Sequence, residues 1–293
     1  MWKKKMPKGI FLFIDMINYM RGIVMFKSIQ YVIKENFSNL YRIFSISKYE
    51  LLADMRDTKL GLFWNFASPA INLLTYWFVF GFVMERNSVD GIPFFNWMLA
   101  GMVVWFFVRP CIVDGCNAIF AHSKMISKMK FPVSILPATV VLKELFNHCC
   151  LMIVLILIFI VQGYRPDIHW LGLIYYCFCA IAFNISITMV LSVLNMIARD
   201  TRKFVSSIMR LLLYLTPILW PLSRFEHYPK IAFIMKSNPI YYIVCGYRDC
   251  FFYHEGFWPY RYRAICFWII TLFLFAFGSV LMHKFKAKFA DLI

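Results

Sequence analysis

Charge is scarce in this sequence, and negative charge is the scarcest. Charged side chains make up 16% of the 293 residues, with only 15 Asp and Glu, whereas soluble domains average about a quarter charged. Hydrophobic residues reach 61%. This excludes the pair of soluble domains that the length alone suggests at about 150 residues per domain. Apolar stretches of roughly 20 residues recur instead, each long enough to cross a ~30 Å hydrocarbon layer as a helix.

The sequence motifs of common catalytic centres are missing as well. None of the 12 glycines is followed by Lys, so the chain lacks the loop that cradles ATP phosphates. The histidines are scattered, and there is no H-E-x-x-H, G-x-S-x-G or C-x-x-C motif. Such motifs mark zinc hydrolases, serine hydrolases and redox or zinc sites. We therefore expect no catalytic residue, no metal site and no cofactor bound by this chain.

Six apolar segments are predicted to span the membrane. They cover residues 60–84, 94–113, 136–161, 170–197, 204–220 and 264–282. Two further apolar pieces, 231–235 and 239–252, are too short to span. We expect these to be re-entrant helices, which are tolerated where protein or a water-filled path shields the backbone. The predicted fold is an all-α integral membrane protein with six transmembrane helices and short re-entrant helices between spans five and six.

The distribution of basic residues predicts an orientation. Net charge is +16, and of the 31 Lys and Arg residues 20 fall on the side of the termini and 8 on the other side. The positive-inside rule then places both termini in the cytosol. Because the cations are dispersed among the spans, they fit topology and lipid headgroups better than a nucleic-acid partner.

The segment before the first span divides into two parts. Residues 1–30 form an extension of unclear role, and residues 31–59 hold an N-terminal amphipathic helix with apolar residues at helical spacing. We expect this helix to lie in the cytosolic membrane interface, the alternative being a surface helix packed on protein. Residues 60–293 then form one six-span transmembrane domain.

Charged and aromatic side chains within the spans are the candidate functional residues. Arg109, Lys143 and Arg210 each cost a few kcal/mol at mid-bilayer, so each needs a partner or a wet path. Lys143 or Arg210 could pair internally with Glu144, and the cations could snorkel to the interface. The functional alternative is that they line a path for an anionic cargo. Aromatic side chains serve as interface belts or stack on sugars. The substrate-path candidates are Arg210, Tyr214, Trp220 and Trp77.

Several motifs occur together in a characteristic order. They are Leu60-Gly61-Leu62-Phe63-Trp64 with Pro69, Trp77 to Phe82, Gly91-Ile92-Pro93-Phe94 with Trp97, Met125 to Pro132, Ala198-Arg199-Asp200, Thr216 to Trp220, and Asn238 to Tyr242 with Arg248. In these motifs the chain resembles ABC-type polysaccharide export permeases from about residue 31 to its end. Within that family it is most similar to the teichoic acid exporter permeases of Gram-positive bacteria.

The resemblance implies a transport subunit and no enzyme. It implies a homodimeric channel in a bacterial plasma membrane, flanked by a separate ABC subunit that binds ATP and Mg²⁺. A coupling helix within residues 114–132 would contact that ATPase, with Lys124, Met125, Ile126, Lys128 and Met129 as candidates. The implied function is export of lipid-linked teichoic acid from cytosol to outer face. Within the same family, the alternative is export of capsule, O-antigen or lipid. Outside it, the alternatives are a membrane-embedded transferase and a channel that needs no ATPase.

Overall fold

The chain is an all-α, multi-pass membrane protein. The computed structural model describes residues 22–56, 59–61, 63–128, 131–225, 227–255 and 261–286. Within these ranges, five helical segments are long and apolar enough to cross a membrane. They are α4 (Phe63–Trp77) continued by the π-helix η1 (Phe78–Val83), α5 (Phe94–Gly115), α8 (Leu136–Val161), α9 (Gly172–Ile197) and α13 (Arg261–Phe285).

The fifth predicted span, residues 204–220, is shorter than expected. The helix α10 (Thr201–Leu215) has 15 residues, about 22 Å of helix, which is less than a bilayer core requires. The helix ends because Thr216 precedes Pro217 and adopts an extended conformation, as residues before proline commonly do. Residues 216–219 then fold inward and are buried. The count of six spans therefore stays a prediction.

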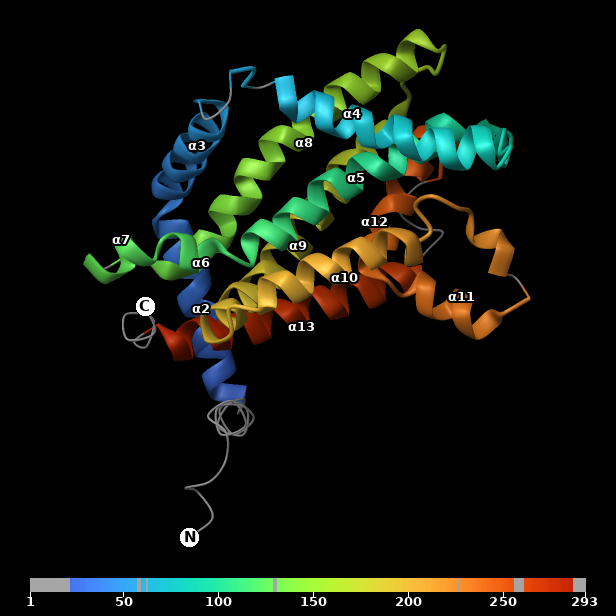
Figure 1. The fold of residues 1–293 in the computed structure, drawn as a ribbon. Coiled ribbons are helices and arrows are strands. Elements are labelled where there is room, and N and C mark those ends of the chain that lie inside the picture. The colour runs from blue at the N-terminus through green and yellow to red at the C-terminus, as the bar shows by residue number, and fades with distance from the viewer. Residues whose placement is uncertain are drawn as a thin grey trace.

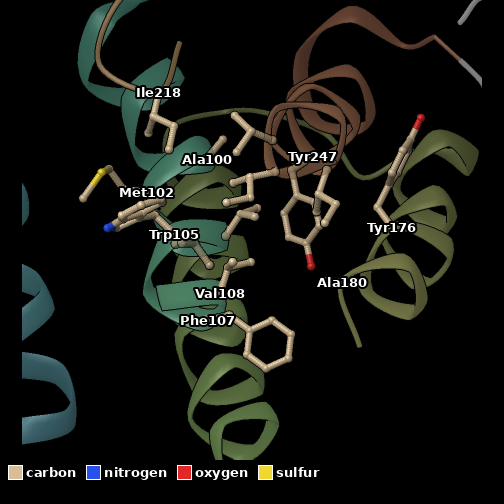
Figure 2. Packing of buried hydrophobic residues seen from close by; sticks show 14 of the residues in the cluster. Ala100, Met102, Trp105, Phe107, Val108, Tyr176, Ala180, Ile218 and Tyr247 are labelled. Atoms are coloured by element: carbon tan, nitrogen blue, oxygen red, sulfur yellow. The ribbon is translucent and has the colours of Figure 1, made fainter. Parts of the chain in front are cut away.

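Helix α5 forms the centre of the bundle. Most of its side chains are buried, and it packs against α8, α9 and α12 (Pro239–Arg248). Figure 2 shows Phe107 and Val108 of α5 on the side of Tyr247 of α12, and Trp105 pointing away from it. Close approach depends on glycine: a Cβ at Gly246 of α12 would lie 2.1 Å from the Tyr176 ring of α9.

The first two spans are joined by a hairpin. Its strands, β1 (Ser88–Val89) and β2 (Ile92–Pro93), pair antiparallel. Asp90 and Gly91 both have positive φ, 51° and 80°, which is the backbone of a type I′ turn and favours an Asp-Gly pair. The Asp-Gly dipeptide between the first two predicted spans thus forms the tight turn of the hairpin.

The bundle has two distinct ends (Figure 1). The α7 end holds α6 (Ala118–Ala121), α7 (Ser123–Lys128) and the last turn of α13. The hairpin end holds β1, β2, α11 (Pro229–Lys236), α12 and the π-helix η5 (Asp249–Tyr253). The described residues also include three short 3₁₀ turns: η2 (Val133–Ile135), η3 (Ile168–Leu171) and η4 (Leu222–Phe225). Helices α11 and α12 match the two short pieces predicted from the sequence, and their re-entrant depth stays a prediction.

In the described part of the chain, from residue 22 onward, two helices precede the first span. Helix α2 (Gly22–Ser38) continues across residue 30 and packs along the last turns of α13, where Ser28 and Tyr31 contact His283. Helix α3 (Leu40–Arg56) packs on α8, with the Ser47 hydroxyl donating to the Thr139 carbonyl at 2.8 Å. Its opposite face exposes aromatic side chains such as Phe44, which suit a membrane interface. The interfacial position of α3 stays a prediction. Residues 1–21 lie outside the described residues.

Candidate translocation cavity

Four helices line an open cavity of about 540 Å³ that has both polar and apolar side chains in its wall. Its walls come from α4, α5, α8 and α10. The side chains on the α4 wall recur every three or four residues and so share one helix face: Asn65, Ser68, Asn72 and Tyr76. A polar stripe on an apolar span faces water or protein, because lipid cannot satisfy its hydrogen bonds. The spacing of these polar side chains is visible in the sequence, and it is the signal that identifies the α4 wall of the cavity.

Two arginines line this cavity, one from each of two neighbouring helices. Arg109 of α5 and Arg210 of α10 both line it. Arg210 donates to the Ser207 hydroxyl at 3.1 Å. Among the described residues, neither guanidinium forms an ion pair with a carboxylate.

The one acid in the cavity wall, Glu144, is already compensated. Its carboxylate lies 3.7 Å from Lys143 and accepts from Asn147 at 3.2 Å. Lys143 in turn reaches Asp54 of α3 at 2.7 Å, and Asn65 of α4 donates to Asn147 at 2.9 Å. This chain of contacts joins α3, α8 and α4, and it leaves the two arginines as the uncompensated charges of the cavity.

The aromatic candidates divide between the cavity and its surroundings. Tyr214 lines the cavity, and its ring lies 6.5 Å from that of Tyr76 across it. Trp220 caps α10 instead, donating its indole N–H to the Tyr214 carbonyl at 2.8 Å. Trp77 packs edge-on against Phe95 and lies outside the cavity wall. Of the four path candidates, the structure brings Arg210 and Tyr214 together and adds Arg109, Trp64 and Trp105.

The segment expected to couple to an ATPase is two short helices. Helices α6 and α7 are separated at His122, whose Nδ1 lies 2.9 Å from the Ala118 carbonyl and whose Nε2 lies 3.1 Å from Glu50 of α3. Both partners are acceptors, so both contacts are hydrogen bonds only when the imidazole carries two protons. The hydrogen bond to Glu50 raises the pKa of His122 above its ordinary value. This contact holds the segment against α3.

One face of α7 is available to a partner. Lys124, Ser127 and Lys128 are exposed, and Met125 is partly so. Ile126 is buried among residues such as Ile119 and Val193, so its side chain stabilises the segment from within. Met129 lies outside the described residues.

At the hairpin end, a buried arginine fixes the turn that follows α10. The guanidinium of Arg248 donates to the backbone carbonyls of Trp97, Pro217 and Ile218 at 2.8–3.2 Å. A second cavity of about 790 Å³ opens beside it, between α11, α12 and η5. The sequence placed Arg248 in a motif but gave no sign of this arrangement, because its acceptors are backbone atoms from two distant segments.

The helices surround a cavity lined by arginine and aromatic side chains, and an exposed basic segment lies at one end of the bundle. This arrangement is suited to a transport subunit. The sequence profile of the ABC-2 type transporter family matches residues 41–252, which include α3 to α12. The chain belongs to this family. The match covers every helix of the cavity wall and the α6–α7 segment, so these are parts of an ABC-2 permease. Members of the family work with an ATP-binding partner.

Curated relatives agree with the assignment. The chain is 27% identical over 213 residues to the O-antigen export system permease protein RfbA of Myxococcus xanthus, covering 73% of this chain and 81% of that protein. It is 27% identical over 249 residues to the protein of the same name from Klebsiella pneumoniae, covering 85% and 93%. Both relatives carry names of transport subunits of export systems.

Proposed function

We propose that this chain is the permease subunit of an exporter that moves a lipid-linked polysaccharide across the membrane. The cavity between α4, α5, α8 and α10 is the part of the path contained in one chain. The observation that carries this proposal is the pairing of Arg109 and Arg210 with aromatic rings in one cavity. Guanidinium groups attract phosphate, and aromatic faces stack on sugars, while weak contacts at each point let a polymer advance.

The uncompensated charge favours an anionic cargo. A teichoic acid, with phosphates along its chain and a lipid pyrophosphate head, fits two arginines that no described carboxylate neutralises. O-antigen is the second candidate, and the names of the relatives favour it. Both cargoes share a lipid pyrophosphate, so the arginines would serve the head group in either case.

Energy would come from a separate subunit. We infer that two copies of this chain pair and that each contacts an ATPase through the exposed face of α7. The α7 end then faces the cytosol and the hairpin end the outer surface of a bacterial plasma membrane. The large apolar surface of α4 and η1, with Ile71, Leu74 and Phe78 exposed in the single chain, is suited to lipid or to a second copy.

Complementation separates the two cargoes. The chain and its partner ATPase are expressed in a strain lacking its own teichoic acid exporter, and separately in a strain lacking its O-antigen exporter. Restored surface polymer in the first strain alone supports the anionic cargo, and restoration in the second alone supports O-antigen. A chain that reaches the membrane with its ATPase yet restores neither polymer would refute both proposed cargoes. The chain purified without a partner is expected to hydrolyse no ATP.

A further inference from the structure

Three side chains with metal-binding atoms meet at the hairpin end, away from the translocation cavity. Asp167 precedes η3, His169 lies within η3, and His254 follows η5. Oδ2 of Asp167 lies 2.7 Å from Nδ1 of His169 and 2.7 Å from Nδ1 of His254. All three ligand atoms lie within 4.8 Å of one another. The fold thus gathers them from two segments that are 87 positions apart.

The arrangement is fixed before any ligand binds. Asp167 caps η3, and its Oδ1 accepts from the His169 backbone N–H at 3.0 Å. This leaves Oδ2 aimed at the two imidazoles. His254 ends η5 with φ 51°, in the left-handed region, where His, Asn and Asp occur more often than most other non-glycine residues.

We propose that Asp167, His169 and His254 form a binding site for a divalent transition metal of the Zn²⁺ class. Two imidazole nitrogens and one carboxylate oxygen are a ligand set that Zn²⁺ accepts, with a fourth position left for water. Ca²⁺ and Mg²⁺ prefer all-oxygen sites and do not fit two imidazoles. The three side chains are partly exposed, so an ion enters directly from the aqueous side.

Binding requires only a small movement of the side chains. Metal–ligand distances near 2.1 Å in tetrahedral geometry separate neighbouring ligand atoms by roughly 3.4 Å. Each nitrogen must therefore move away from Oδ2 by somewhat less than 1 Å, and its proton must shift to Nε2. Exposed side chains accommodate such a shift easily. The bound ion would tie the turn between α8 and α9 to the end of η5, where Trp170 already packs against Phe251 at 5.1 Å.

The competing explanation is a purely hydrogen-bonded cluster. In that case each imidazole donates its Nδ1 proton to the same carboxylate oxygen and the cluster binds no ion. The substitution His254→Asn separates the two explanations, because Asn tolerates the left-handed region and keeps an N–H donor but supplies no imidazole. His169→Ala removes the other imidazole. His227→Ala is the matched control, since His227 is an exposed histidine outside the cluster.

The test is Zn²⁺ titration of the full chain, purified in detergent through a tag without histidine. Calorimetry should give one Zn²⁺ per chain for the unmodified protein and for His227→Ala. Affinity should fall at least tenfold in His254→Asn and in His169→Ala. Co²⁺ spectra should lack a thiolate charge-transfer band, which excludes binding by the cysteines. Thermal midpoints without metal verify that each variant is folded.

The proposal is overturned by three results: no stoichiometric binding, unchanged affinity in folded His254→Asn, or a thiolate band in the Co²⁺ spectrum. The outcome is independent of the proposed transport function, because none of the three residues lines the translocation cavity. Metal binding without export, or export without metal binding, would each refute one proposal and leave the other.

Discussion

The guanidinium carbon of Arg248 lies 3.3 Å from the centre of the Trp97 ring. Arg248 is buried within the hairpin end, and it also donates to the carbonyls of Pro217 and Ile218. One cation thus joins α12, the start of α5 and the turn after α10. Cation–π contact and hydrogen bonds to backbone carbonyls together replace the carboxylate that a buried arginine usually requires.

Replacing Arg248 is expected to destabilise the chain. Arg248→Lys cannot reach three carbonyls or stack on Trp97 as a planar group does. We expect a loss of at least about 2 kcal/mol, the usual value for hydrogen bonds to a charged donor. The loss of stability is measured as a lower thermal midpoint of the protein in detergent. Arg165→Lys is the control, because Arg165 is an exposed arginine at the same end. Equal midpoints for the two variants would contradict the structural role.

Arg210 is expected to act on cargo through its charge. Arg210→Ala should lower export about tenfold, the equivalent of ~1.4 kcal/mol of attraction, while Arg210→Lys should keep part of the activity. Export is measured as surface polymer per amount of chain in the membrane. Lys203→Ala, which removes an exposed cation from the same helix, should export normally.

A charge swap on α10 and α8 distinguishes a structural role of Arg210 from contact with cargo. If Arg210 paired with Glu144, then Arg210→Glu combined with Glu144→Arg would restore export. The structure shows Glu144 beside Lys143 instead, so we expect the double variant to reach the membrane and to fail in export. Full export by the double variant would show that Arg210 has a structural role and no contact with cargo.

The α7 face is expected to transmit ATP hydrolysis. Met125→Asp places a charge on the face that contains Lys124 and Lys128, and should abolish stimulation of the partner ATPase while the chain still inserts. Stimulation is measured on the purified complex in lipid. The control is Asn87→Asp, on the exposed loop at the hairpin end, which should leave the stimulation of the ATPase unchanged. Normal stimulation and export in Met125→Asp would remove this segment from the coupling mechanism.

The contact between His122 and Glu50 predicts a pH dependence. The pKa of His122 is raised by its hydrogen bond to Glu50, so its contribution to stability is complete below the unfolded value near 6.5. That contribution is lost as pH rises through the higher folded pKa. His122→Gln should therefore lower the thermal midpoint more at pH 6 than at pH 8.5. Glu50→Gln should abolish this difference, and a pH-independent effect of His122→Gln would contradict it.

The orientation of the bundle can be tested chemically. In a chain without other cysteines, Asn87→Cys and Ser127→Cys should react with impermeant reagents from opposite sides of the membrane. Both positions are exposed, one beside the hairpin and the other on α7. Labelling of both from outside would contradict the orientation derived from the positive-inside rule.

Local elements were largely determined by the sequence itself. The span predicted over 136–161 coincides with α8, because an uninterrupted apolar run forms a helix wherever lipid or protein surrounds it. The Asp90-Gly91 turn follows from two residues that accept positive φ. The breaks before α11 and α12 follow from Pro229 and Pro239, each at the first turn of its helix.

Contacts between distant residues were decided only by the tertiary structure. Arg109 and Arg210 share one cavity, Lys143 reaches Asp54 rather than pairing with Glu144 alone, and Asp167 meets His254. Each contact depends on the order and rotation of neighbouring helices. Many arrangements bury similar apolar area, and within a bilayer hydrophobicity does not distinguish one helix face from another. Close packing selects among them, as at Gly246 against Tyr176, and so determines which polar side chains meet.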